Sequence, residues 1–423
     1  MSLVKAIVRN NHNHVITIAL NDLFPESSDA IRAEFNGLLP KDNIRVWHTP
    51  SPVCEYAIGN VWRRRTAELL REAFFTSLQP DVVLVASFIE GFSQNVVTSI
   101  GSFTSDINTV TILYDLIPLL NPTQYLDISP YFKKHYMRKI RQLKNSDGIL
   151  TISDYSAMEG ITSLSLNKQI ICNISSGCDD IFRQNNNIQK IKTIHQSYIL
   201  YTGGVDARKN IQRLIEAYAI IPKSLREKYK LIIVGKIKKW QKFKIELTAI
   251  AAGLNKNDIQ FMGYVSDEEL VSLYRQCTVF VFPSWHEGFG LPALEAINCG
   301  TPVIGANTSS LPEVIGCEEA LFNPFDANDM AQKLQQSLCD ATFREQIKSE
   351  EMRHAAQFSW DVSAKRAIDF IETLPRKQVR TLSRDTIIDS LIEKISQIEE
   401  GEPTETDLKA TALAIAQNHP IVI

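Results

Sequence analysis

Two glutamates separated by seven residues, Glu287 and Glu295, are the side chains whose types and spacing best support chemistry in this sequence. An ionised carboxylate accepts hydrogen bonds from vicinal hydroxyl groups. Gly288 and Gly290 lie between them, in a segment whose backbone amides can approach a phosphate at a helix N-terminus. The pattern predicts a site for a phosphate flanked by hydroxyl-rich rings, as in a sugar nucleotide. A plain strand–loop–helix unit with surface glutamates is the alternative, because glycine loops are weak signals.

A predicted strand, loop and helix must position these two carboxylates. Residues 279–282 form an apolar, β-branched and aromatic run that is typical of a buried strand. Pro292 suits the first position of a helix, and Gly300 suits its C-cap. Glu287 therefore lies in the loop before the helix and Glu295 lies inside it. They do not share a helical face, but both can reach one ligand that lies across the helix start.

Two cations, Arg208 and Lys209, precede another predicted helix, which follows an apolar strand at 198–201. Adjacent cations at a helix N-terminus can bind an anion and neutralise a diphosphate leaving group. An exposed Arg-Lys pair without a ligand is the alternative interpretation.

The composition is that of an ordinary globular protein. The chain has 423 residues, with 44% hydrophobic and 22% charged residues, so two domains with an appendage are expected. A net charge of −3 gives no general attraction to nucleic acid, and neither a membrane span nor a signal peptide is visible. The seven cysteines include no Cys-x-x-Cys pair, which predicts reduced thiols in the cytoplasm. The eight histidines show no metal-binding spacing.

The segment from Glu287 to Glu295 resembles the two-glutamate motif of retaining glycosyltransferases of family 4, also called glycosyltransferase group 1, which have the GT-B fold. Arg208-Lys209-Asn210 resembles a second element of the same family. The resemblance extends to about residue 376, and the mannosyltransferase-like modules of bacterial multi-domain polysaccharide glycosyltransferases are the members that the chain resembles. It implies an α/β fold with two tandem Rossmann-like domains, a cleft between them and a C-terminal helical tail.

The alternation of predicted strands and helices agrees with that architecture. An asparagine-rich segment, 183–196, is the predicted interdomain linker. The predicted divisions are 1–187 for an acceptor-side domain, 188–356 for a nucleotide-sugar-binding domain, 357–376 for a helix that returns to the first domain, and 377–423 for a helical tail or linker.

The resemblance also implies roles for individual residues. Glu287, Arg208 and Lys209 are expected to be catalytic. The donor is expected to bind at Gly204, Val265, Gly288, Phe289, Gly290, Leu291 and Glu295. Tyr114 and Asp115 are expected on the N-terminal side of the cleft, where many relatives have His-Asp; a turn cap is the alternative role for Asp115.

The implied reaction is metal-independent, retaining hexosyl transfer in bacterial polysaccharide or lipopolysaccharide synthesis. The donor is a GDP- or UDP-linked sugar, with mannose or a related hexose as the best match, and it is a substrate, so neither a cofactor nor a metal is expected. The acceptor is a saccharide or a lipid-linked saccharide, and no nucleic-acid partner is expected. The implied location is cytoplasmic, with peripheral association at the inner face of the membrane. A non-catalytic GT-B module that scaffolds a larger synthase is the alternative, and a phosphorylase or epimerase is a third.

The two ends of the chain depart from the family pattern. A doubly wound domain begins with an apolar strand and a glycine-rich turn, but here the first predicted element is a helix at 3–10. The expected strand and loop are therefore absent, and a gap in the first sheet is predicted. The tail resembles connectors to an adjoining glycosyltransferase module. An excised module and a naturally short start both remain open.

Overall fold

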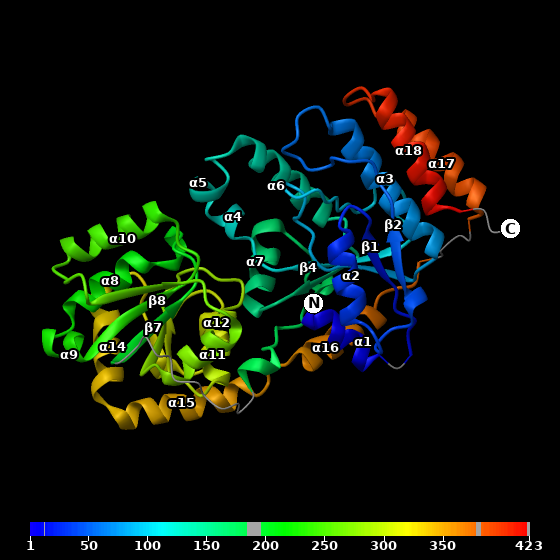
Figure 1. Ribbon diagram of the computed structural model, residues 1–423. Helices are drawn as coiled ribbons and strands as arrows, with labels where there is room; N and C mark the ends of the chain where they lie inside the picture. Colours follow the sequence, from blue (N-terminus) through cyan, green and yellow to red (C-terminus); the bar gives the residue numbers. More distant parts are fainter. Residues whose placement is uncertain (12, 184–195, 378–381, 421–423) are drawn as a thin grey trace. The chain divides into compact units, whose positions relative to one another are not determined.

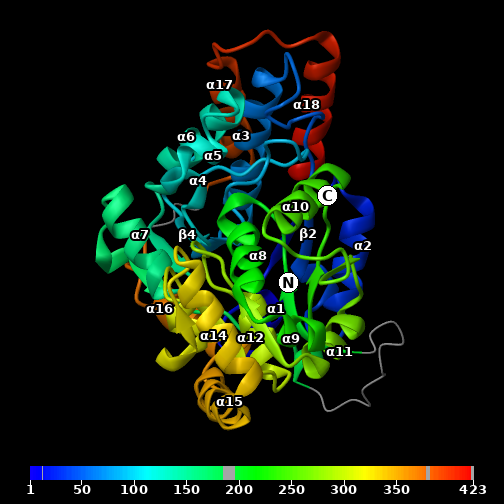
Figure 2. The ribbon, with the colours of Figure 1, turned by 90° about the vertical axis from the view of Figure 1, so that its left-hand side faces the viewer.

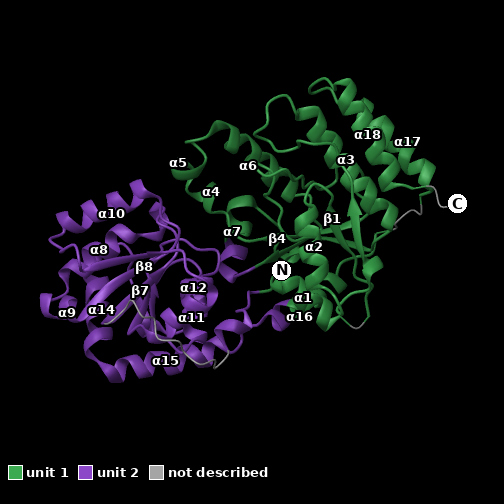
Figure 3. Ribbon diagram, viewed as in Figure 1, with its two compact units in different colours: residues 1–151, 159–174, 364–423 green, residues 152–158, 175–363 purple. Residues whose placement is uncertain are grey.

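A computed structural model describes residues 1–11, 13–183, 196–377 and 382–420 (Figure 1). The predicted interdomain linker at 183–196 falls almost entirely outside the described residues. The chain forms two compact units (Figure 3). Unit 1 contains residues 1–151, 159–174 and 364–423, and unit 2 contains residues 152–158 and 175–363. Helices α7 (Asp154–Leu164) and α16 (Trp360–Glu372) contribute residues to both units.

Unit 2 is built on one six-stranded parallel sheet with the order β12-β11-β10-β7-β8-β9. Its strands are β7 (Ser197–Thr202), β8 (Tyr229–Val234), β9 (Ile259–Gly263), β10 (Val279–Phe282), β11 (Val303–Ala306) and β12 (Leu321–Phe322). Its helices are α8 (Ile211–Ile220), α9 (Lys223–Lys228), α10 (Lys239–Ala251), α11 (Asp267–Gln276), α12 (Leu291–Asn298), α13 (Leu311–Ile315), α14 (Ala327–Cys339) and α15 (Ala341–Ala355).

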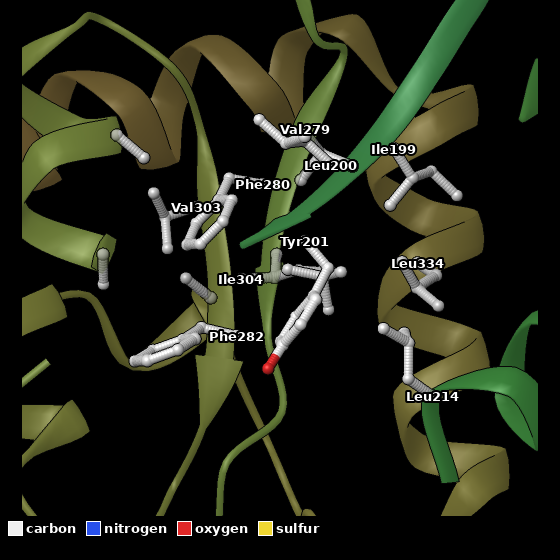
Figure 4. Close-up of a cluster of buried hydrophobic side chains, with 14 of the residues drawn as sticks. Ile199, Leu200, Tyr201, Leu214, Val279, Phe280, Phe282, Val303, Ile304 and Leu334 are labelled. Carbon is white, nitrogen blue, oxygen red and sulfur yellow. The ribbon is translucent and has the colours of Figure 1, made fainter. Parts of the chain in front are cut away.

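The core of unit 2 explains why its strands read as unbroken apolar runs. A parallel sheet is covered by helices on both faces, so its side chains are buried on both sides. Ile199 and Phe280, on neighbouring strands, are fully buried. Leu214 of α8 and Leu334 of α14 belong to the same apolar cluster (Figure 4). This core fixes the positions of the loops at the carboxyl ends of the strands.

Unit 1 differs because its strands form two separate parallel sheets, β1-β2 and β3-β4-β5-β6. Among the described strands, none joins β1 to β3, so the break that the sequence predicts in the first sheet is present. The strands are β1 (Ile18–Asn21), β2 (Ile44–Trp47), β3 (Val82–Val85), β4 (Asn108–Leu113), β5 (Gly148–Thr151) and β6 (Ile171–Asn173). The helices are α1 (Ser2–Asn10), α2 (Pro25–Glu34), α3 (Val61–Leu78), α4 (Ile117–Leu120), α5 (Pro122–Tyr125), α6 (Pro130–Leu143), α17 (Arg384–Ser396) and α18 (Glu405–Asn418).

The C-terminal region is helical, as predicted, and it packs within unit 1. Helices α17 and α18 lie beside α3 in both views (Figure 1 and Figure 2). Leu391 of α17 and Leu70 of α3 are fully buried in one apolar cluster. Arg63 Nε donates a 2.7 Å hydrogen bond to Asp407, and this bond contributes most to lowering the pKa of that carboxyl to about 2. The predicted tail is therefore an integral layer of unit 1.

Two cations of unit 1 are buried although they lie on long helices. Arg64 of α3 is 5% exposed and donates a hydrogen bond to Glu55. Lys139 of α6 is 1% exposed and donates a 2.6 Å hydrogen bond to Thr98 Oγ1. Burial lowers the pKa of Lys139 to about 7.

Across the described helices, we find none that combines the length and apolar character needed to cross a bilayer.

Candidate functional site

The candidate site lies at the topological switch point of the sheet in unit 2. From β7 the chain first adds β8 and β9 on one side, and it then adds β10, β11 and β12 on the other. The connections that follow β7 and β10 therefore leave the sheet in opposite directions. Ligands of open α/β sheets bind outside the carboxyl ends of the strands at such a point. The predicted cation segment follows β7, and the predicted glutamate segment follows β10.

The structure brings together the three residues that were predicted to be catalytic. Arg208 Nη1 donates to Glu287 Oε2 at 2.7 Å, and Lys209 Nζ donates to Glu287 Oε1 at 2.6 Å. The side chains of Arg208, Lys209 and Glu287 are 19%, 13% and 10% exposed. Asp206 Oδ2 lies 3.1 Å from Arg208 Nε. One carboxylate thus holds two cations in a fixed, largely desolvated position.

Backbone contacts between the two loops keep this group in place. Trp285 donates its amide hydrogen to the carbonyl oxygen of Arg208 at 3.0 Å. Asn210 has a φ of +59°, in the left-handed region that asparagine tolerates better than most residues. Its side-chain amide donates to the carbonyl oxygens of Pro283 and Pro324 at 3.0 and 2.7 Å. Asn210 therefore ties the turn after β7 to the turns after β10 and β12.

The glycine loop is held by hydroxyl groups and by close packing. Ser310 Oγ lies 2.9 Å from the carbonyl oxygen of Glu287 and 2.7 Å from that of Phe289. Ser153 Oγ donates to the carbonyl oxygen of Gly288 at 2.7 Å. Gly290, the N-cap of α12, has a φ of +115°, and a Cβ there would lie 2.8 Å from Leu311 Cδ2. A side chain at this position would be strained and would push the loop away from α13.

Glu295 has a different partner, which sequence reasoning missed. Tyr274 OH donates to Glu295 Oε2 at 3.1 Å and lies 3.0 Å from Thr202 Oγ1 at the end of β7. Burial raises the pKa of Glu295 to about 7. The two glutamates thus approach the carboxyl end of β7 from different sides, Glu287 through the cations and Glu295 through a phenol. In the sequence, Tyr274 reads only as an apolar residue of an amphipathic helix.

The other residues predicted to bind the sugar-nucleotide donor differ in their surroundings. The Gly204 carbonyl oxygen accepts a 2.6 Å hydrogen bond from Tyr201 OH. Val265 packs against the core just after β9. Phe289 is 3% exposed, with its ring 5.6 Å from that of Phe358, so its side chain belongs to the core. Leu291, in contrast, is 39% exposed at the start of α12.

A close approach of two glycines adds a feature that the sequence did not reveal. Gly203 and Gly235 follow the neighbouring strands β7 and β8, with φ values of +141° and +151°. A Cβ on Gly235 would lie 2.1 Å from the Gly203 carbonyl oxygen. Because neither glycine has a side chain, the two backbone segments can approach each other closely beside the switch point.

Tyr114 and Asp115 belong to unit 1, at the carboxyl end of β4. Tyr114 OH donates to the Ala86 carbonyl oxygen at 2.9 Å. Asp115 Oδ1 accepts from the Ile117 amide at 3.0 Å, which is the turn-capping contact considered as its alternative role. Both residues line a cavity of about 380 Å³ in unit 1, together with polar residues that include Glu90 and aromatic rings that include Phe92.

One possible metal-binding group occurs among the described residues, and it lies outside the switch point. Cys317, Glu319 and Glu350 each place a ligand atom within 4.8 Å of the others. The thiol of Cys317 is 3.2 Å from Glu350 Oε2, and burial raises its pKa to about 12. The thiolate is the form that binds metal, so an ion bound here would have to displace the thiol proton.

Comparison with known proteins gives a family match and a similar protein of known name. Residues 183–354 match the family described as "Glycosyl transferases group 1". The chain is 32% identical to the "Serotype-specific mannosyltransferase WbdA" of Escherichia coli, over 99% of this chain and 50% of that protein. It thus spans about half the length of that relative.

Two solved structures have a similar fold. The first is WaaG, a glycosyltransferase involved in lipopolysaccharide biosynthesis, with a TM-score of 0.60 and 18% identity over 88% of this chain and 95% of that chain. The second is Anabaena Alr3699/HepE in complex with UDP and glucose, with a TM-score of 0.63 and 16% identity over 85% of this chain and 100% of that chain.

The fold and the strand-end site together define a GT-B protein with two Rossmann-like units. Within that class, residues 183–354 of this chain match the glycosyl transferases group 1 domain.

Proposed function

We propose that this chain transfers a hexose, with mannose as the preferred sugar, from a nucleotide sugar to a saccharide acceptor in bacterial polysaccharide synthesis. The observation that carries this proposal is the pairing of Arg208 and Lys209 with Glu287 at the switch point. The similarity to WbdA supports mannose as the sugar. The intact pairing also favours an enzyme over a non-catalytic scaffold, because a scaffold has no need for two desolvated cations at a strand end.

The two cations would carry the electrostatic part of the reaction. Lys209 has three N–H donors and Arg208 has five, and Glu287 accepts one from each in this structure. Arg208 Nη1 also donates to the His286 carbonyl oxygen at 2.9 Å, and its Nε lies 3.1 Å from Asp206 Oδ2. The positive charge of the two cations would therefore act on a diphosphate, whose negative charge grows as the bond to the sugar breaks. Arg208 and Lys209 supply the positive charge that a metal ion would otherwise supply. We therefore propose that transfer needs neither a metal nor a cofactor.

The glutamates would recognise hydroxyl groups. Glu287 accepts from the hexose, and Glu295 accepts from the ribose of a GDP- or UDP-linked donor. The loop at Gly288–Gly290 and the start of α12, with Leu291, would border the diphosphate, while Gly204 and Val265 would border the nucleoside through their backbone. The buried side chain of Phe289 would serve by fixing the loop rather than by touching the ligand.

The proposed stereochemical outcome is retention. The acceptor hydroxyl attacks C1 of the hexose from the face that the diphosphate leaves. The C1–O bond to phosphate breaks, the C1–O bond to the acceptor forms, and the acceptor proton passes to a diphosphate oxygen. The cavity lined by Tyr114, Asp115 and Glu90 in unit 1 is the proposed acceptor site. A lipid-linked acceptor, a peripheral position at the membrane and an adjoining module in a longer protein are part of this proposal.

The test is a transfer assay on the 423-residue chain with a panel of GDP- and UDP-sugars and a mannose-containing oligosaccharide acceptor. We expect GDP-mannose to raise the melting temperature most and to be consumed in the presence of EDTA. NMR of the product should show the anomeric configuration of the donor. Loss of turnover in EDTA that Mg²⁺ or Mn²⁺ restores would contradict metal independence, and an inverted product would contradict the mechanism. Failure of every nucleotide sugar to bind would contradict the proposed donor.

A further inference from the structure

An apolar stripe lies exposed on α10 of unit 2. Trp240, Phe243, Leu247 and Ile250 are 63%, 60%, 50% and 66% exposed. They occur at intervals of three or four residues, so they lie on one side of the helix. Isolated exposed apolar side chains are common, but a contiguous row of them marks an interaction surface.

The stripe is not a misplaced core face, because α10 has a separate face toward the core. Ile245 is the buried residue of this helix, at 8% exposure. At 100° per residue, Ile245 points about 180° away from the centre of the stripe. α10 packs along α8 through its inner side (Figure 1). The helix is therefore apolar on two opposite sides, and only one of them is used within the unit.

Lysines border the stripe. Five of the nine residues from 236 to 244 are lysines, and all five are exposed: Lys236, Lys238, Lys239, Lys242 and Lys244. Lys239 and Lys244 lie on opposite sides of the stripe by helical geometry. Glu246 faces Lys242 at 3.9 Å, between side chains that are about half exposed, and a pair of that kind leaves most of the positive charge uncompensated. Tyr264, 71% exposed, lies beside the same cluster with its ring 4.8 Å from Lys236 Nζ.

We propose that α10 binds an anionic lipid bilayer, with its Trp240–Ile250 stripe in the headgroup region and its lysines against lipid phosphates. A helix with tryptophan and phenylalanine on one side and lysines along its flanks has the composition of an interfacial helix. Aromatic rings favour this depth, because one part of the ring is apolar and the other is polar. Each nearby lysine adds attraction to a negative surface. The inference rests on the membrane-facing location proposed above, but its test needs no donor and no acceptor.

The alternative occupants of the stripe are a second copy of the chain and another protein. The lysine border argues against a second copy, because two such surfaces facing each other would bring like charges together. The lysine border favours a partner with a negatively charged surface. The exposed tryptophan and phenylalanine favour a partner that has an apolar interior below that surface. A bilayer of anionic lipid has both properties.

The test measures co-sedimentation of the 423-residue chain with vesicles of phosphatidylglycerol and phosphatidylethanolamine. We expect W240S/F243S to reduce the bound fraction by about tenfold or more and K239Q/K242Q/K244Q to do so at low salt. The L408S/L413S variant is the matched control, because it removes two exposed leucines, at 52% and 60%, from α18. The K133Q/K134Q variant is the control for charge, since it removes two exposed lysines from α6.

Fluorescence provides a second readout that separates contact from folding. On adding vesicles, the emission of Trp240 should shift to shorter wavelength, and brominated lipid should quench it. The conservative W240F variant should keep binding and lose the shift. Equal binding by the wild type and W240S/F243S would overturn the proposal, as would equal binding to phosphatidylcholine vesicles. A dimer in the absence of lipid that W240S/F243S dissociates would assign the stripe to a second copy instead. Nucleotide-sugar binding should be unchanged in every variant.

Discussion

Each unit contains a cluster of partly desolvated charges, and the two clusters are built differently. In unit 1, Glu55 accepts hydrogen bonds from Arg64 and, at 2.8 Å, from Arg138 Nη2. Glu68, with its side chain 1% exposed, accepts from Arg138 Nη1 at 2.6 Å. These residues lie on or beside the long helices α3 and α6. In unit 2, the charges lie on loops at the carboxyl ends of β7 and β10.

The difference shows that burial of charge does not by itself mark a functional site. In unit 1, one guanidinium bridges two carboxylates, so opposite charges are matched within the cluster. In unit 2, Arg208 and Lys209 share Glu287, and Asp206 also pairs with Arg208, so the charges are matched there as well, but they lie on loops at a switch point. The first arrangement stabilises contacts between helices, and the second places two cations at strand ends, where ligands of open α/β sheets bind. Three experiments separate these roles, ordered by the size of the expected effect.

The largest effect should come from Glu55→Ala, which removes the shared carboxylate of unit 1. Breaking a buried ion pair leaves uncompensated charge, so we expect the free energy of unfolding to fall by about 3–5 kcal/mol at pH 7. Hydrogen exchange in α3 and α6 should report it, while turnover per folded molecule stays unchanged. Glu34→Ala is the control, because the Glu34 side chain is 53% exposed and a surface pair contributes little.

The pH dependence of that effect has a defined sign. Burial acts to raise the pKa of Glu55, but the hydrogen bond with His135 and the nearby guanidinium charges outweigh it and lower the pKa to about 2. Because the folded pKa lies below the unfolded value of 4.5, the contribution is present above pH 4.5 and is lost as the pH falls toward 2. A wild type and variant that differ equally at pH 3 and pH 7 would show that the carboxylate charge is not the cause.

The next effect concerns turnover in unit 2. Lys209→Ala should reduce kcat by about 10²–10³-fold and donor affinity by a smaller factor, because charge on the leaving diphosphate is greatest in the transition state. The measurement is kcat beside the donor Kd. Lys223→Ala is the control: it removes a lysine of the same unit whose side chain is 71% exposed. Equal losses in binding and turnover would place Lys209 in donor recognition alone.

The smallest effect follows from Glu295. Its pKa of about 7 exceeds the unfolded value of 4.5, so between those pH values the folded state binds more protons than the unfolded state. Stability therefore falls as the pH rises through this window, by about 3 kcal/mol in total. Glu295→Gln should flatten the melting temperature across pH 5–8.

Donor affinity offers a second readout for Glu295. It should rise with pH in the wild type, since only the ionised carboxyl accepts from both ribose hydroxyls, and Glu295→Gln should remove that rise. A steep profile that survives the substitution would assign the titration to another group.

The strand–loop–helix around Glu287 was predictable because its signals are local. The apolar run at 279–282 is strand β10 with those bounds, and Pro292 lies in the first turn of α12, which begins one residue earlier than predicted. The pairing of Glu287 with Lys209 joins segments 78 residues apart, and only the family resemblance pointed to it.

Other features had no local signal at all. The bond between Tyr274 and Glu295 depends on how α11 packs against α12, and the burial of Lys139 depends on its contact with Thr98. Strand β12 has only two residues, too few to show a periodic pattern. Short segments of this kind take their conformation from the sheet that they join rather than from their own sequence.

The packing of α17 and α18 on α3 has a consequence for the order in which the protein forms during its synthesis. Unit 2 comprises residues 152–158 and 175–363, so all of it has left the ribosome while residues 364–423 are still being added. Until residues 364–423 emerge, unit 1 lacks α17 and α18. It therefore also lacks Leu391 and the other side chains that these helices contribute to the apolar cluster with α3. Domains usually complete themselves from the N-terminus onward. Here the part that is translated first is finished last, and ribosome-bound chains stalled so that residue 363 has just left the exit tunnel should be protease-resistant in unit 2 while α3 is still cleaved.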